Sequence, residues 1–598
     1  MKANKFFMVL ALSSLSLGFS SCLDFDDPDD KYQYTEMQAE DVVLQGKADS
    51  IGYLEYVPSE TGVDEAIQRL DTYLRMTITG QFAMRGGKNG DMPGEHAYQR
   101  QYSLGPDNYA QYSTVPHFDF MYGTLESTYD VSDDFNAGPN SSYLIVKNAI
   151  APILNHPDID SIPEMKAIYL LMFDFASQEV ADIYGPYPYA DFKANREESP
   201  FTYNDLSSIY FTIEANIDTI VNVLKHYDTR PEWYKTKVQK LMTDYTRLTQ
   251  DLITGKTGMD TWIRFANSLK LRMAMRIVKV DPEMAQKWAE EAVAAGVVEG
   301  PEQELAFSPL ILGFTNPLLQ IWNGWGDNRL SASFESLLMS LGHPYAEYLF
   351  AKNGNKLTNE VTGEVLPEKS RIVGLREGIT PGQGQGFATN PMIGFSQFVP
   401  DVISIAPLYL MKMSEVDFLR AEGAVRGWNM GGTAQEFYER GIEYGYLDER
   451  MVGADPTYTS AMATYMNLEA AYDYTYHDPL GRVPDEPSLT KIGVKWNDGD
   501  DKETKLEKII TQKYIAGFPN SFEAWADLRR TGYPKLFPVL NPDDGDGSLN
   551  EGDIIRRCVF PNTDDSSLRD IQETGLSALG GPDQQATRLW WDIDVPNF

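Results

Sequence analysis

The sequence predicts a mainly α fold in which helices pack in pairs and carry large loop-rich insertions. Apolar residues recur at spacings of three and four in several long segments, and this is the period of an amphipathic helix. Between these segments, residues 300–406 are rich in Gly, Pro, Asn and aromatic residues and show few such stripes. The 598-residue chain is 42% hydrophobic and 12% aromatic, which is enough for a packed core.

The N-terminal segment indicates an exported protein. Lys2 and Lys5 precede the short apolar run FFMVLALSSLSL, and small residues follow before Cys22. This is the layout of a secretory signal, and the run is too short to cross a bilayer as a stable helix. The segment FSSC resembles a bacterial lipobox, although Phe19 stands where an aliphatic residue is usual. The resemblance implies that residues 1–21 are removed and that Cys22 carries a lipid anchor. The alternative is an exported protein with a chance cysteine.

Residues 22–40 begin CLDFDDPDD and predict an acidic, flexible tether after the anchor. Acidic residues in this position also resemble the surface-export signal of lipoproteins. The formal net charge of −36 argues against nucleic-acid binding, which needs a basic surface. The two cysteines exclude a disulfide framework, and Cys558 is expected to be an unpaired, buried residue.

The first half of the body shows several helical patterns. We predict helices over residues 164–184, 206–224, 260–277 and from Pro282 to Gly296. The first is apolar enough to be buried, and it stops at a Gly-Pro pair. Asn204 or Asp205 can cap the second helix. Asp281 and Pro282 begin the fourth helix as its N-cap and first helical residue.

A second helical block is predicted from about Leu408. Within it, Thr433 and Glu436 have the spacing of a capping box at the start of another helix. Short antiparallel helices with small residues at their crossing resemble tetratricopeptide repeats. No strict 34-residue period is visible, so the scaffold is predicted to be a degenerate tetratricopeptide-like one.

A third helical block is predicted over residues 505–530, where Asn520 and Glu523 form a box-like cap. No Ser- or Pro-rich linker divides the chain. We therefore expect a single helical domain over residues 41–598, with a loop-rich insertion at about 300–406.

Six segments, spread in order from residue 22 to residue 592, carry a family resemblance. They are the lipobox at Cys22, DIYGPYPY (182–189), WIRFANSLKLRMAMRI (262–277), LMKMSEVDFLRAEGAVRGW (410–428), FEAWADLRRTGYP (522–534) and RLWWD (588–592). Together they resemble the SusD/RagB family of outer-membrane lipoproteins, and in particular its second large SusD-like branch. His343-Pro344-Tyr345 departs from the pattern, because many relatives carry Asp-Pro-Arg there.

The resemblance implies four tetratricopeptide-like helix pairs and no enzyme activity. It also implies a protein of the outer membrane, held there by its N-terminal lipid and facing the cell surface. Such proteins resemble lids on a SusC-like TonB-dependent transporter, to which they deliver glycans or oligopeptides. The chain offers no catalytic motif, and its six histidines are scattered without metal spacing, so we expect no cofactor and no metal.

The densest cluster of sugar-binding residue types lies in the segment IWNGWGDNR. Sugars stack their C–H faces on aromatic rings, while Asp, Asn and Arg bond to the hydroxyls. The candidates in this segment are Trp322, Asn323, Trp325, Asp327, Asn328 and Arg329. The alternative is two core tryptophans with polar turn residues, since Trp is buried on average.

A second candidate lies earlier in the chain, where Tyr109 and Tyr112 offer amphipathic rings that Arg85 could approach. The alternative is that this segment begins a helix with Tyr112 in the core. The family resemblance implies a site assembled from an early loop segment and the middle insertion, which suits both candidates.

The predicted function is glycan binding as the lid of a transporter, because two tryptophans fall within four residues of a Gly/Asn loop. An oligopeptide-binding lid and a docking adaptor without its own ligand site are alternatives. A surface hydrolase is disfavoured: Glu415 and Glu422 share a helix face, but this is also the spacing of a salt-bridged scaffold helix.

Overall fold

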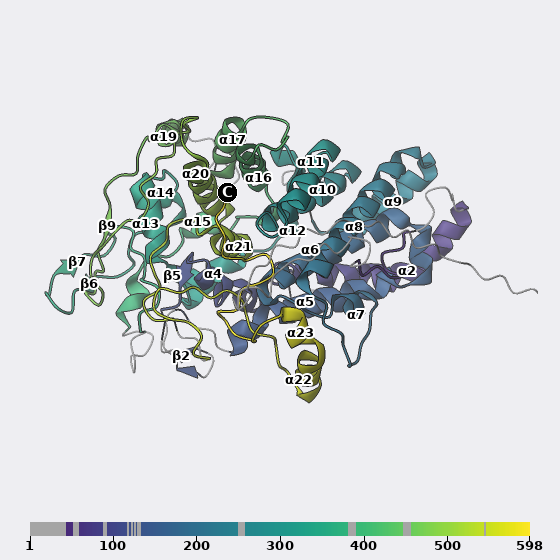
Figure 1. Cartoon of the computed structure of the whole chain (residues 1–598), viewed down its shortest axis with the longest axis horizontal. Helices are drawn as coiled ribbons and strands as arrows, with labels where there is room; N and C mark the ends of the chain where they lie inside the picture. Colours follow the sequence, from purple (N-terminus) through teal and green to yellow (C-terminus); the bar gives the residue numbers. More distant parts are fainter. Residues whose placement is uncertain are drawn as a thin grey trace, which may run out of the picture. The chain divides into compact units, whose positions relative to one another are not determined.

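Helices dominate the computed structural model, and this confirms the predicted mainly α, tetratricopeptide-like fold class (Figure 1). The structure describes residues 43–51, 59–87, 92–116, 119–120, 123–124, 127, 129, 133–248, 258–380, 390–446, 456–542 and 546–598. These residues belong to one compact unit, Gln38–Phe598. The predicted signal peptide, Cys22 and the acidic tether lie outside the described residues, so the expectations for them stay predictions.

The scaffold consists of long helices that contact one another in pairs. Helices α2 and α5, α6 and α8, α10 and α11, and α16 and α17 form such pairs, and α20 packs on α16. The long helices are α2 (Glu60–Ala83), α5 (Asp133–Leu154), α6 (Pro163–Tyr184), α8 (Leu206–His226), α9 (Glu232–Tyr245), α10 (Met259–Arg276), α11 (Pro282–Ala295), α13 (Ala332–Leu341), α16 (Met413–Arg426), α17 (Ala434–Tyr446), α19 (Pro456–Met466), α20 (Lys502–Gly517) and α21 (Ser521–Thr531).

Shorter elements connect these helices and fill the insertions. The short helices are α3 (Glu95–Tyr98), η2 (Gln99–Ser103), α4 (Pro106–Tyr109), η3 (Pro157–Ser161), α7 (Tyr189–Lys193), η4 (Tyr227–Thr229), η5 (Pro301–Gln303), α12 (Pro309–Leu312), η6 (Leu319–Trp325), α14 (Ala346–Leu349), η8 (Pro391–Gly394), α15 (Pro400–Ile403), α22 (Asp565–Asp570), η9 (Ile571–Gly575) and α23 (Leu576–Leu579). The strands form antiparallel pairs. They are β1 (Ser113–Thr114) with β5 (Arg329–Leu330), β2 (Asp119–Phe120) with β3 (Gly123–Thr124), β4 (Leu305–Phe307) with β8 (Leu408–Met411), β6 (Leu357–Thr358) with β7 (Val365–Leu366), and β9 (Thr475–Tyr476) with β10 (Glu486–Pro487).

Three predicted helix starts are confirmed by their capping bonds. The Asp205 carboxylate accepts from the Ser208 backbone N–H at 2.9 Å at the start of α8. Asp281 caps α11 in the same way. At the start of α17, Thr433 and Glu436 exchange side chain–backbone bonds of 2.9 and 3.2 Å, which is the predicted capping box.

Two details of the predicted helical blocks are wrong. Residues 408–411 form strand β8 rather than the start of a helix, because this short apolar run is ambiguous by periodicity alone. The block at 505–530 is two helices, since Pro519 lies between α20 and α21 and cannot continue a helix. Asn520 is the N-cap of α21, but its side chain makes no capping bond. Glu523 instead bonds to Arg276.

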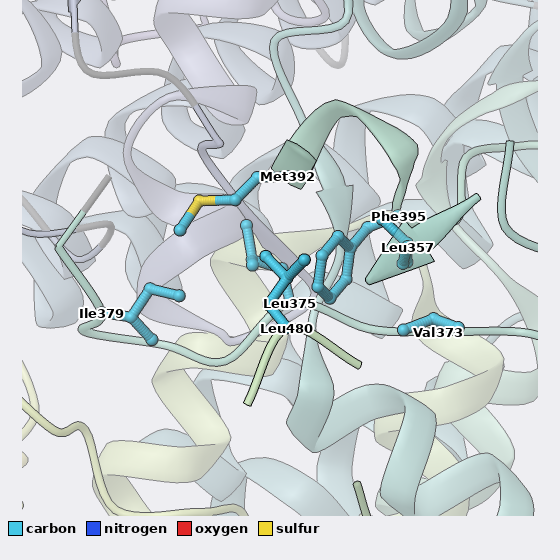
Figure 2. Packing of buried hydrophobic residues seen from close by; sticks show 7 residues of the cluster. All are labelled: Leu357, Val373, Leu375, Ile379, Met392, Phe395 and Leu480. Atoms are coloured by element: carbon cyan, nitrogen blue, oxygen red, sulfur yellow. The ribbon is translucent and has the colours of Figure 1, made fainter. Parts of the chain in front are cut away.

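The loop-rich insertion has its own hydrophobic cluster. The cluster consists of Leu357, Val373, Leu375, Ile379, Met392, Phe395 and Leu480, and Figure 2 shows their side chains converging on one another. Burial of these side chains holds irregular segments in place without long helices. The insertion is therefore a packed framework that can position surface residues, and Leu480 ties it to the later part of the chain.

Four of the segments that carry the family resemblance, residues 182–189, 262–277, 410–428 and 522–534, meet in a buried network of ion pairs. Arg272 of α10 bonds to both oxygens of Glu415 in α16, at 2.7 and 3.0 Å. Arg276, one turn later, bonds to Asp182 of α6 at 3.0 Å and to Glu523 of α21 at 2.7 Å. These helices are far apart in the sequence, so the charged residues fix how the scaffold helices cross.

Two further expectations concern single features. Cys558 is fully buried, as predicted, and burial raises the pKa of its thiol to about 12. Among the described residues, no helix combines the length and the apolar character needed to span a bilayer.

Candidate functional site

The two sequence segments with candidate binding residues lie side by side. Strand β1 pairs with strand β5, so that Ser113 lies opposite Leu330. Next to this pair, the Asn328 amide donates to the Ser103 carbonyl at 2.7 Å and to the Ser113 hydroxyl at 2.8 Å. The early segment and the middle insertion therefore contact each other.

Helix η6 sends its two tryptophans in different directions. Trp322 is 1% exposed, and its ring centroid lies 4.1 Å from that of Phe398. Trp325 follows three residues later and is half-buried at the surface. The helix ends at Gly326, whose φ of 79° is left-handed and suits glycine. Trp322 is thus a core residue, whereas Trp325 presents part of its ring to solvent.

Trp325 stacks on an exposed histidine from the other segment. The ring of His96 in α3 lies 4.6 Å from the Trp325 ring, with 26° between the planes. Three residues after His96, the Gln99 amide donates to the Asp327 carboxylate at 2.5 Å. We call Trp325, His96, Gln99 and Asp327 the Trp325 platform. The two rings offer flat aromatic surface, and the Gln99 amide and the Asp327 carboxylate beside them are 6% and 7% exposed.

The charge state of Asp327 follows from its surroundings. Burial raises the pKa of its carboxyl to about 6, although the Arg329 charge and the Gln99 bond oppose the shift. The Asp327 side chain therefore changes charge in mildly acidic conditions. Asn323, also half-buried, donates to the Phe398 carbonyl at 2.9 Å and so ties η6 to the framework.

Arg329 and Asn328 serve the framework. Arg329 is 1% exposed and donates to the carbonyls of Ile393, Gly326 and Asn328 at 2.7–3.0 Å. Burial lowers the pKa of its guanidinium to about 9. Asn328 is fully buried. A ligand at the surface does not reach these side chains, which instead shape the turn that follows Trp325.

The earlier candidates are also in the interior. Tyr109 and Tyr112 are 0% exposed, and the Tyr112 ring lies 4.4 Å from that of Tyr514. Arg85 is buried as well and bonds to both carboxylate oxygens of Glu179, at 2.9 and 3.0 Å. The core alternative describes Tyr112, and Tyr109 and Arg85 are likewise buried rather than exposed to a ligand.

His96 and Gln99 were missed by the sequence reasoning. Their spacing of three residues places them on one side of a helical turn, and this pattern was the available signal. Nothing local in the sequence, however, indicates that Trp325 lies beside them, because that contact joins residues far apart in the chain. In the part of the chain that the structure describes, no three His, Cys, Asp or Glu side chains are grouped to hold a metal ion.

Comparison with known proteins places the chain in a family. A search of curated proteins finds no match. A chitin-binding SusD homolog from Flavobacterium johnsoniae is 31% identical with a TM-score of 0.71, over 88% of this chain and 99% of its own. A susD homolog from Bacteroides thetaiotaomicron is 28% identical with a TM-score of 0.70, over 87% of this chain and 99% of its own. A model of the family described as Susd and RagB outer membrane lipoprotein matches residues 64–592. The chain therefore belongs to the SusD-like family of outer-membrane lipoproteins.

Proposed function

We propose that this protein binds glycan chains at the cell surface and that the Trp325 platform is the contact surface. The observation that carries the proposal is the stack of Trp325 on exposed His96, with Asp327 and Gln99 beside it. Sugar rings place their C–H faces on such aromatic surfaces, and their hydroxyls bond to carboxylates and amides. The chitin-binding homolog supports a polysaccharide as the ligand class.

Binding without turnover is part of this proposal. The two carboxylates that a hydrolase would need on α16 are both occupied. Glu415 bonds to Arg272, and Glu422 bonds to Arg530 at 2.7 and 2.8 Å. Burial alone would raise the pKa of Glu422, but Arg530 and Arg426 outweigh it and lower the pKa to about 2. A carboxylate with that pKa is a poor general acid near neutral pH.

We further propose that the protein acts as the lid of a SusC-like TonB-dependent transporter, anchored by a lipid on Cys22. Membership in a family of outer-membrane lipoproteins supports this role. An anchored lid would capture a glycan on the Trp325 platform and pass it to the transporter. Co-purification of the transporter with the full-length protein from its own membrane tests the partnership.

The binding proposal is tested by titrating the purified protein with chito-oligosaccharides, xylan, starch and mixed oligopeptides by calorimetry. We expect saturable binding of at least one glycan, and a loss of affinity of about fivefold in Trp325→Ala, because stacking contributes roughly 1 kcal/mol per ring. The matched control is Trp233→Ala, which removes another half-buried tryptophan in α9. Equal affinities in the two variants, or a response to peptides alone, would overturn the proposal.

A further inference from the structure

A polar cavity lies beside the last turn of α21. Its volume is about 690 Å³, within the range of roughly 300–1,000 Å³ that small-ligand sites occupy. The lining consists of Lys279 after α10, Glu503 in α20, the end of α21, and residues of the segments 549–556 and 586–597. None of these residues belongs to the Trp325 platform. The charged residues of the lining are Lys279, Arg529, Arg530, Arg556, Arg588, Glu503, Asp553 and Asp594. Cations thus outnumber acids here, although the chain as a whole carries a net charge of −36.

Two arginines of this lining have a buried nitrogen without a hydrogen-bond partner among the described residues. Arg529 donates to the carbonyls of Asp182 and Arg556 at 2.7 and 2.8 Å, but its Nη2 has no partner among the described residues. Arg530 bonds to Glu422, but its Nε likewise has no partner there. Both residues are at most 3% exposed. A buried donor without an acceptor costs free energy, so such donors indicate a missing acceptor.

Lys279, in the same lining, also lacks an ion-pair partner among the described residues. Its side chain is half-buried, and no carboxylate of the described residues lies within ion-pair distance of its ammonium. Burial, followed by the charges of Arg530 and Arg588, lowers the pKa of Lys279 to about 8, although Asp592 and Asp594 oppose this shift. Among the described residues, Lys279 therefore feels the charges of Asp592 and Asp594 without an ion pair to either carboxylate.

The nearby acids are engaged elsewhere. Buried Asp592 lies 3.2 Å from Arg556 and 3.0 Å from Arg588, so one carboxylate serves two cations. Glu503 accepts from the Tyr533 hydroxyl at 2.8 Å and from the Asn597 amide at 2.7 Å. Asp553 accepts from the side chain and backbone of Asn550, and Asp594 is 91% exposed and 3.7 Å from Arg588. None of these acids forms an ion pair with Lys279 or accepts a hydrogen bond from Arg529 Nη2 or Arg530 Nε.

We propose that this cavity binds a compact oxyanion, such as sulfate or phosphate, between Lys279 and the unused N–H groups of Arg529 and Arg530. Tetrahedral oxyanions offer several acceptors at once, and charge-assisted bonds from Lys and Arg are the strong ones. The volume exceeds that of a single ion, so the same oxyanion group on a larger molecule also fits. The site is independent of the proposed glycan platform.

The test titrates the purified protein with sodium sulfate and with sodium phosphate at pH 7 and constant ionic strength, following heat and the melting temperature. We expect saturable binding of at least one anion, with a melting temperature that rises with its concentration, and no such effect of chloride. Lys279→Met should lose at least tenfold in affinity, Lys279→Arg should retain binding, and Lys287→Met, an exposed lysine on α11, should match the wild type. Each variant should melt like the wild type without the anion.

A competition arm distinguishes a free ion from an anionic group on a glycan. A sulfated disaccharide and its unsulfated form are added to the protein saturated with sulfate. Displacement by the sulfated form alone identifies a sulfated sugar as a ligand, whereas displacement by neither identifies a free-ion site. Absence of saturable binding, or equal binding by wild type and Lys279→Met, would overturn the proposal. Trp325→Ala should bind the anion normally, so the result does not depend on the glycan platform.

Discussion

Arg276→Met is the substitution that tests the buried ion network most sharply. Arg276 is 2% exposed and bonds to Asp182 at 3.0 Å and to Glu523 at 2.7 Å. The charges of the surrounding cations outweigh burial and hold the pKa of Glu523 well below its usual range. Methionine fills a similar volume, but it leaves the buried carboxylates of Asp182 and Glu523 with fewer cations beside them. Removing one partner of a buried ion pair costs about 3–5 kcal/mol.

This cost converts into a measurable shift of the melting temperature. Unfolding entropy of about 2.1 cal/mol/K per residue, over the roughly 560 residues of Gln38–Phe598, amounts to about 1.2 kcal/mol/K. A loss of about 4 kcal/mol therefore lowers the melting temperature by roughly 3 °C. Scanning calorimetry measures the shift, and urea unfolding measures the free energy of unfolding independently.

The matched control is Arg75→Met. Arg75 also donates to both oxygens of a carboxylate, that of Asp71, at 2.9 and 3.1 Å, but this pair is exposed on α2. Exposed pairs contribute little because water and salt screen them, so we expect no measurable shift. If Arg276→Met lowers the melting temperature no more than Arg75→Met, the scaffold role of the ion network is refuted.

Three further predictions concern substitutions with defined outcomes. Trp322→Ala should destabilise the protein by about 3–5 kcal/mol in urea unfolding, whereas Trp325→Ala should stay within about 1 kcal/mol of the wild type. Burial lowers the pKa of His343 to about 3. Because folded His343 stays neutral, its contribution to the free energy of unfolding is fully present above the unfolded pKa of about 6.5. Below that pH the contribution falls by roughly 1.4 kcal/mol per pH unit. From pH 6.5 to 5, the wild type should therefore lose about 2 kcal/mol more than His343→Asn. Gly374→Ala places a Cβ 2.2 Å from the Ser331 carbonyl oxygen and should lower the free energy of unfolding by about 1–3 kcal/mol. The first prediction is contradicted if Trp322→Ala lowers the free energy of unfolding no more than Trp325→Ala does. The second is contradicted if wild type and His343→Asn lose stability equally between about pH 6.5 and 5, and the third if Gly374→Ala is as stable as the wild type.

The scaffold was predictable because its signals are local. The caps at Asp205, Asp281 and Thr433 each lie within four residues of their partners, and the apolar stripe of α10 repeats within one helix. The strand at Leu408–Met411 was missed because its partner, β4, lies about a hundred residues earlier. Local patterns do not show whether a short apolar run will find a distant strand.

The candidate site was predicted only in part, since burial depends on contacts between distant segments. Trp322 and Trp325 look equivalent in the sequence, but the first meets Phe398 in the core and the second meets His96 at the surface. Arg85 resembles a ligand-binding arginine until the structure pairs it with Glu179. The composition of the segment indicates aromatic binding chemistry, while the fold decides which rings face solvent.

The most direct test of the central proposal is a crystal structure of the protein with a bound chito-oligosaccharide. We predict that one sugar ring lies over the Trp325 indole at about 3.5–4 Å, the distance of optimal van der Waals contact. The sugar hydroxyls should then lie within hydrogen-bond distance of Asp327 or Gln99. A sugar bound elsewhere, with Trp325 and His96 left open to solvent, would contradict the proposal.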